Sequence, residues 1–100
     1  MYHFNIKLGL TSKDKTTKWD YTTAERVVGA RLKLGGFNGA SFSYARGYWM
    51  GDFEDTLVID IYDSYEKLDI VKDMCAGLRI DFAQDCVLLQ HAPAADTLFI

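Results

Sequence analysis

The sequence has few of the residues that build metal centres and disulfide frameworks. It contains two cysteines, Cys75 and Cys86, two histidines, His3 and His91, and one proline. Isolated cysteines and histidines do not supply the paired spacing of a zinc site. We expect both thiols to be reduced and buried in the core of a cytosolic protein. The low proline content argues against a disordered tail or a rigid linker.

Long runs of basic or of apolar residues are also absent. The net charge is −3 and the pI is about 5.2. Because phosphate binding needs a concentrated cationic face, this charge pattern argues against a nucleic-acid partner. No stretch reaches the roughly 18–20 apolar residues that span a bilayer, and the N-terminus starts with strand-like alternation, so we expect neither a membrane segment nor a signal peptide. The sequence therefore predicts one cytoplasmic globular domain over residues 1–100.

Hydrophobic periodicity predicts an α+β domain. Alternating or β-favouring segments predict strands over 2–10, 41–47, 56–63 and 85–90, with a short edge strand over 97–100. A helix is predicted to start at the N-cap Thr22, with Glu25 three residues later, and to end at Gly35-Gly36. A second amphipathic helix is predicted over 65–83.

The predicted order β-α-β-β-α-β is that of a ferredoxin-like fold, an antiparallel sheet with two helices on one face. The other face of the sheet is predicted to mix apolar and polar side chains: Val58, Tyr62, Val87 and Leu89 with His3, Asn5, Lys7, Ser43 and Asp60. Such a face suits contact with another copy of the chain. We therefore expect an oligomer.

The segment Gly47–Asp55 is the strongest candidate for a chemical site. It contains Tyr48, Trp49, Met50 and Phe53 between and after two glycines, and the carboxylates Asp52, Glu54 and Asp55. We interpret it as a loop held by the strand that begins at Thr56, a position where binding groups concentrate. Aromatic faces beside carboxylates suit a compact organic cation such as a sulfonium or ammonium group. A solvated turn is the alternative interpretation, and the spacing does not match a calcium loop.

Two short motifs in the second half of the chain carry a family resemblance. Gln84-Asp85-Cys86-Val87-Leu88-Leu89 follows the second predicted helix, and Glu54-Asp55-Thr56-Leu57-Val58 leads into the third predicted strand. Both resemble segments of the phage-encoded S-adenosylmethionine (SAM) lyases, formerly called SAM hydrolases. In that family a functional tyrosine precedes a catalytic glutamate. The resemblance implies that Tyr48 and Glu54 are the catalytic residues, although the segment between them is shorter here.

The resemblance also implies a reaction and an assembly. In these lyases the substrate's own carboxylate attacks its γ-carbon, which releases methylthioadenosine and closes homoserine lactone. The sulfonium is already a good leaving group, so the reaction needs no general acid, metal or cofactor. A PII-like homotrimer with sites between subunits is implied, as is an anti-restriction role in which a phage depletes the methyl donor of its host. We expect Gly9, Leu10, Thr11 and Trp49 to contact the substrate.

Two other functions fit the same residues. The acidic, aromatic segment suits a non-enzymatic inhibitor that binds a host protein, because Tyr48 and Trp49 are typical of interface hot spots. A PII-like sensor would bind an adenosine ligand without consuming it. An assay with the small molecule alone distinguishes the enzyme from the inhibitor, and recovery of intact bound ligand would indicate the sensor.

Overall fold

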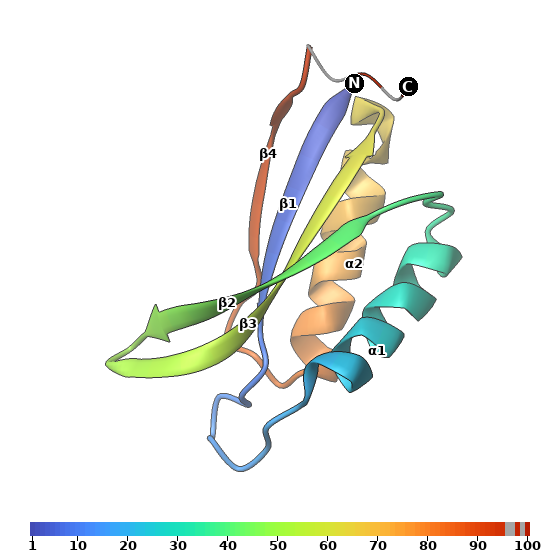
Figure 1. Ribbon diagram of the computed structural model, residues 1–100. Helices are drawn as coiled ribbons and strands as arrows, with labels where there is room; N and C mark the ends of the chain where they lie inside the picture. Colours follow the sequence, from blue (N-terminus) through green and yellow to red (C-terminus); the bar gives the residue numbers. More distant parts are fainter. Residues whose placement is uncertain (96–97, 99) are drawn as a thin grey trace.

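Four strands form one antiparallel sheet in the order β2-β3-β1-β4. The computed structural model describes residues 1–95, 98 and 100, and Figure 1 shows its elements. They are β1 (Tyr2–Gly9), α1 (Tyr21–Leu34), β2 (Ser41–Trp49), β3 (Asp52–Asp63), the short 3-10 turn η1 (Tyr65–Lys67), α2 (Leu68–Asp81) and β4 (Leu88–Pro93). The edge strand predicted over 97–100 falls outside the described residues.

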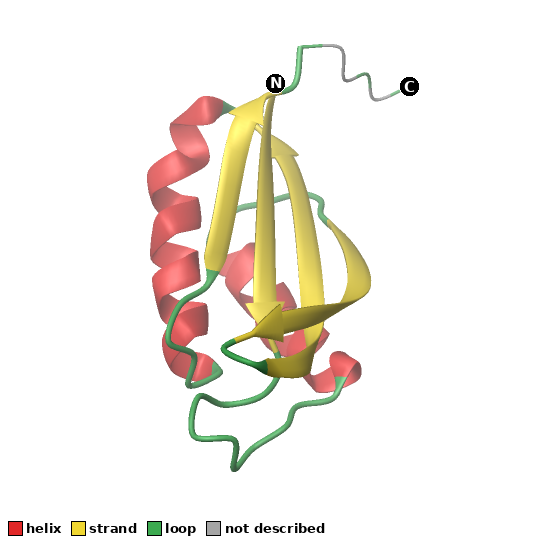
Figure 2. Cartoon of the chain, turned by 90° about the vertical axis from the view of Figure 1, so that its left-hand side faces the viewer, coloured by secondary structure: helices red, strands yellow, loops and turns green. Residues whose placement is uncertain are grey.

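Both helices pack on the same face of the sheet (Figure 2), so the predicted ferredoxin-like arrangement is confirmed. The two central strands contribute six fully buried side chains to the core: Phe4, Ile6 and Leu8 of β1, and Leu57, Ile59 and Ile61 of β3. Each set occupies alternate positions, because successive side chains of a strand point to opposite faces. The helices cover these side chains with Val28 of α1 and with Val71 and Leu78 of α2.

Helix α1 begins earlier than predicted. The sequence predicts Thr22 as the N-cap, but the Asp20 carboxylate accepts a hydrogen bond from the Thr23 N–H (2.7 Å), so Asp20 is the N-cap. Both residue types are good N-caps. The position is decided by Trp19, whose ring packs edge-on against Phe82 of the core and so fixes the chain just before Asp20. The hydrogen bond from Thr23 lowers the pKa of Asp20.

The hairpin of β2 and β3 extends beyond the rest of the sheet as an arm (Figure 1). The prediction of a loop over Gly47–Asp55 is wrong, because β2 and β3 pair without interruption as far as Trp49 and Asp52. The two-residue turn Met50-Gly51 joins the strands, and both of its residues have positive φ (50° and 86°). This is the requirement of a type I′ turn, whose twist matches that of paired strands.

Strand β4 begins later than predicted and in the opposite phase. The strand is predicted from Asp85, but pairing with β1 starts at Leu88 and places Leu89 opposite Ile6. Leu89 and Val87 therefore pack against the core. Because a shift of one residue moves a side chain to the other face, Leu88 occupies the outer face instead. The prediction that Val87 and Leu89 lie on that face is wrong.

The outer face of the sheet carries a network of polar side chains. His3 Nε2 lies 2.7 Å from Asp60 Oδ1, and Asn5 Nδ2 donates a hydrogen bond to the same oxygen (2.8 Å). Lys7 Nζ donates in turn to Asn5 Oδ1 (3.0 Å). The His3 ring stacks on Tyr62, with 4.5 Å between the ring centroids. The face mixes polar and apolar side chains, as the sequence predicts, but with Leu88 in place of Val87 and Leu89.

The two cysteines lie in different environments. Cys75 of α2 is buried, and burial raises the pKa of its thiol to about 11. Cys86 is exposed, because it falls before the first paired residue of β4. The expectation that both thiols are buried is therefore wrong for Cys86. The two thiols are free, as expected.

Candidate functional site

The arm presents two different faces. Paired residues of an antiparallel hairpin share a face, and successive pairs alternate between faces. One face, called here the Glu54 face, consists of Gly47, Trp49, Asp52, Glu54 and Thr56. Tyr48 is paired with Phe53 and lies on the opposite face. The predicted catalytic residues Tyr48 and Glu54 therefore project in opposite directions within one chain.

Gly9 leaves room for the Glu54 carboxylate, and Gly47 leaves room for the neighbouring Thr56 side chain. A Cβ atom on Gly9, at the end of β1, would lie 2.8 Å from Glu54 Cδ. A Cβ on Gly47, which is paired with Glu54, would lie 2.7 Å from Thr56 Oγ1. Real side chains do not approach this closely. The half-buried Glu54 carboxylate thus lies directly over the main chain of Gly9, where any larger residue would displace it.

Glu54 has no cationic partner among the described residues. The ion pairs in that part of the chain join His3 to Asp60, Lys15 to Asp52 and Arg31 to Asp81. Hydrogen bonds to an ionised carboxylate are about twice as strong as those between neutral groups. A half-buried carboxylate without a counter-ion is therefore suited to a ligand that brings positive charge or hydrogen-bond donors.

Gln84 closes one side of the space above Gly9, and sequence reasoning did not identify it. The residue is only 8% exposed. Nε2 donates hydrogen bonds to the carbonyl oxygens of Thr11 (2.6 Å) and Phe82 (3.0 Å). Oε1 lies 2.7 Å from the point that a Cβ on Gly9 would occupy. The sequence places Gln84 only between a helix and a strand, and no local pattern indicates that the tertiary fold brings it to Glu54.

The segment after β1 contributes main chain rather than side chains. Leu10, a predicted substrate contact, has its side chain in the core. Its N–H donates to the carbonyl oxygen of Asp55 (2.9 Å), and its own carbonyl accepts from the Trp19 N–H (2.9 Å). The main-chain N–H and carbonyl of Leu10 are therefore already hydrogen-bonded within the chain. Its neighbours Gly9 and Thr11 lie beside the site. Gly9 lies under the Glu54 carboxylate, and the Thr11 carbonyl accepts a hydrogen bond from Gln84 Nε2.

Aromatic side chains line both faces of the arm. Trp49, a predicted substrate contact, is the diagonal neighbour of Glu54 on the Glu54 face and is about half exposed. On the opposite face, the ring of Tyr48 packs edge-on against Phe53 (5.1 Å between centroids), and the Arg46 guanidinium lies 5.1 Å from the centroid of the Phe53 ring. Tyr48 is still 67% exposed. The arm thus offers aromatic surface in two directions.

The loop after β1 is tied to the tip of the arm. Asp14 accepts hydrogen bonds from the hydroxyls of Ser12 and Thr16 (both 2.7 Å) and from the Thr16 N–H (3.1 Å). These bonds lower the pKa of Asp14 to about 2. They shape the turn at which Lys15, with φ of 62°, forms an ion pair with Asp52. An ammonium group is therefore held at the edge of the Glu54 face.

The three carboxylates of the arm do not converge. Asp52 and Glu54 lie on the Glu54 face, whereas Asp55 is paired with Arg46 on the opposite face. Within the described ranges, no group of three His, Cys, Asp or Glu side chains is arranged to hold a metal ion. The site is therefore one carboxylate, one amide oxygen and an indole, grouped around glycine main chain.

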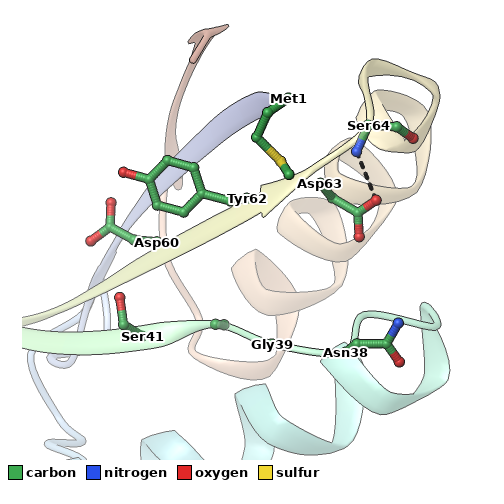
Figure 3. Close-up of a pocket in the computed structure, with 9 residues that line it drawn as sticks. Met1, Asn38, Gly39, Ser41, Asp60, Tyr62, Asp63 and Ser64 are labelled. Carbon is green, nitrogen blue, oxygen red and sulfur yellow. Dashed lines mark hydrogen bonds between the residues drawn. The ribbon is translucent and has the colours of Figure 1, made fainter. Parts of the chain in front are cut away.

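A separate hollow of about 700 Å³ lies at the other end of β3 (Figure 3). Met1, Ser41, Asp60, Tyr62 and Asp63 are among the residues that line it. Asp60 is six residues along β3 from Glu54, about 20 Å in an extended strand. Figure 3 shows that the side chains lining this hollow are spread around an open surface and do not point to one position. We place the candidate site at Glu54, where polar groups converge.

Comparison with solved structures shows which known proteins this chain is similar to. A phage SAM lyase in complex with S-methyl-5′-thioadenosine matches with a TM-score of 0.79 and 26% identity, over 91% of this chain and 79% of that one. A phage SAM lyase in the apo state matches with a TM-score of 0.80 and 25% identity, over 91% and 78%. The chain is similar to phage SAM lyase. The predicted resemblance is confirmed at the level of structure.

Other comparisons support the fold alone. CutA1 from Pyrococcus horikoshii matches with a TM-score of 0.69 and 16% identity, over 98% of this chain and 87% of that one. The PII-like protein CutA from Nostoc sp. PCC 7120 matches with a TM-score of 0.61 and 10% identity, over 96% and 83%. No protein-family model matches the sequence, and no curated protein matches it. Among the described residues, no helix has the length and apolar character needed to cross a membrane.

Proposed function

We propose that this chain is a SAM lyase, which cleaves SAM to methylthioadenosine and homoserine lactone. The observation that carries this proposal is the half-buried Glu54 carboxylate, without a counter-ion and over the main chain of Gly9, in a chain similar to a phage SAM lyase that binds S-methyl-5′-thioadenosine. A carboxylate beside the exposed indole of Trp49 suits a substrate with two cationic groups, a sulfonium and an ammonium.

The reaction makes modest demands on the protein. The substrate's carboxylate oxygen attacks its γ-carbon, the γ-carbon–sulfur bond breaks, and its electron pair neutralises the sulfonium. No proton has to move, because the thioether product leaves as a neutral molecule. The protein must hold the substrate folded with the reacting atoms in line and keep competing water away. In this proposal Glu54 anchors the cationic part of the substrate, and Trp49 and Tyr48 pack against it.

We place the complete site between copies of the chain. Tyr48 and Glu54 leave the arm from opposite faces, so one chain alone cannot direct both at the same ligand. In a homotrimer, Tyr48 of one copy can complete the site of another. The exposed aromatics of the arm and the mixed outer face of the sheet support such an assembly. In an infected host cytoplasm, the activity would deplete the methyl donor that restriction systems use.

The test is incubation of the purified protein with SAM, followed by chromatography and mass detection of the products. The wild type should give methylthioadenosine and homoserine lactone. Glu54→Gln should fold and lose about two orders of magnitude in rate, the scale of a misplaced substrate. Asp55→Asn is the matched control, since it removes the adjacent carboxylate on the opposite face, and it should retain the wild-type rate.

The other outcomes decide between the alternatives. Homoserine formed without a lactone intermediate would keep the substrate and change the mechanism to hydrolysis. SAM that binds and is recovered intact would indicate a sensor. SAM that neither binds nor reacts would contradict the proposal and favour a protein inhibitor. An unchanged rate in Glu54→Gln would remove Glu54 from the mechanism.

A further inference from the structure

Gln84 is fixed in one orientation by its own amide nitrogen. Nε2 donates to two carbonyl oxygens, those of Thr11 and Phe82. A rotated amide would place Oε1 against these two oxygens, and an amide oxygen has no hydrogen to donate. The assignment of nitrogen and oxygen therefore follows from the hydrogen-bond network. Oε1 must point away from both carbonyls, toward the space above Gly9.

Oε1 and the Glu54 carboxylate border the same space above Gly9. Gln84 Oε1 and Glu54 Cδ lie 2.7 Å and 2.8 Å from one point, the position of a Cβ on Gly9. No donor in the described part of the chain reaches Oε1, and the residue is only 8% exposed. The atom is also not sealed inside the protein. Two acceptors, one of them anionic, thus share a space that lacks a donor.

A ligand group that satisfies both acceptors must donate two hydrogen bonds, and a positive charge on it would also neutralise the Glu54 carboxylate. Acceptors that are largely removed from bulk water are paired with donors in native proteins, and Oε1 is accessible enough for a bound molecule to supply one. A primary ammonium group has three N–H donors and a positive charge. A sulfonium has no hydrogen to donate, and a ribose diol has two O–H donors but is neutral. We propose that Gln84 Oε1 and the Glu54 carboxylate together bind the primary ammonium group of an amino-acid substrate, an inference that rests on the proposed function in naming SAM as that substrate.

The first test compares SAM with methylthioadenosine, because only SAM has the ammonium group whereas both have the ribose diol. In Gln84→Met, the affinity for SAM should fall about tenfold or more, the loss of one hydrogen bond to a charged group. It is measured through the KM if SAM is cleaved and by calorimetry if SAM is bound intact. The affinity for methylthioadenosine should remain within about twofold. An equal loss for both ligands would assign the acceptor pair to the ribose and overturn the proposal. Unchanged affinities for both would leave Gln84 a purely structural residue.

A second variant keeps the Gln84 amide. Gly9→Ala places a methyl group where the two acceptors meet, and the atoms it would meet are the ends of the flexible Glu54 and Gln84 side chains. Gly9 is not among the residues with positive φ, so the fold should persist. SAM affinity should fall while methylthioadenosine affinity is retained. Gly29→Ala is the control, because a Cβ there meets nothing within 4 Å. Wild-type SAM affinity in Gly9→Ala would contradict the proposal.

The two proposals can fail separately. If the wild type binds SAM but leaves it intact, the lyase function is wrong, and the comparison of SAM with methylthioadenosine still tests the ammonium site. If the wild type cleaves SAM and both variants keep wild-type affinity for it, the lyase function stands and the ammonium site is wrong.

Discussion

Tyr48 and Glu54 leave the β2–β3 arm from opposite faces, because the pair Tyr48–Phe53 alternates with the pair Gly47–Glu54. The resemblance to SAM lyases implies that both residues belong to one active site, but the arm is a regular hairpin that directs them to opposite faces. A site that contains both must therefore draw them from two copies of the chain. The assembly can therefore be tested by measuring the activity of mixed chains.

Two inactive variants should restore activity to each other. Tyr48→Ala and Glu54→Gln should each be nearly inactive alone. When the two chains are unfolded together and refolded as a mixture, some sites will combine an intact Glu54 with an intact Tyr48. Random pairing of two chain types predicts up to roughly a quarter of the wild-type rate. A mixture no more active than its parents would place both residues in one chain or remove Tyr48 from the site.

The sequence predicts the sheet and core well, since these depend on local periodicity. The alternation of Phe4, Ile6 and Leu8 correctly predicts the buried face of β1. The sequence does not predict the arm, because Met50 is not a typical residue for positive φ. The turn it forms with Gly51 is therefore hard to recognise from sequence.

The sequence predicts less of the candidate site than of the fold. Glu54 stands out because of the aromatic and acidic residues around it. Gln84 is 30 residues away and reaches Glu54 only through the packing of the α2–β4 connection against the segment after β1. Such a contact depends on tertiary structure, which no periodicity or spacing in the sequence records.

Charge at the edge of the Glu54 face should tune the affinity for a cationic substrate. The Lys15–Asp52 pair is more than half exposed, so it contributes little to stability. Asp52→Asn leaves the ammonium of Lys15 unpaired near Glu54 and should raise the KM for SAM about two- to threefold, from one charge at roughly 7 Å in water. Lys15→Met should lower the KM by a similar factor.

The double variant and the salt dependence provide the controls for this prediction. Lys15→Met with Asp52→Asn removes both charges and should return the KM close to the wild-type value. The single-variant effects should fade as ionic strength rises, because salt screens exposed charges. Changes of the same sign in both single variants would show that the ion pair acts by holding the loop rather than through its charge.

Acid should release the turn that presents Lys15. Hydrogen bonds from Ser12 and Thr16 lower the pKa of Asp14 to about 2, from 3.8. Because the folded-state pKa is depressed, the ionised Asp14 stabilises the fold above about pH 4, and this contribution is lost as the pH falls toward about 2. The difference in thermal midpoint between wild type and Asp14→Ala should be constant above about pH 5 and shrink below about pH 4. A difference that does not change with pH would contradict a role for the ionised carboxylate.

The two thiols should differ sharply in reactivity. A thiol reacts as the thiolate, and burial raises the pKa of Cys75 to about 11, whereas Cys86 is exposed. A chromogenic disulfide reagent at mildly alkaline pH should therefore modify one cysteine rapidly in the native protein and the second only after denaturation. Cys86→Ser should abolish the rapid phase, and Cys75→Ser should leave it unchanged. Rapid modification of both thiols would contradict the burial of Cys75, and a lack of rapid modification would show that the assembled protein covers Cys86.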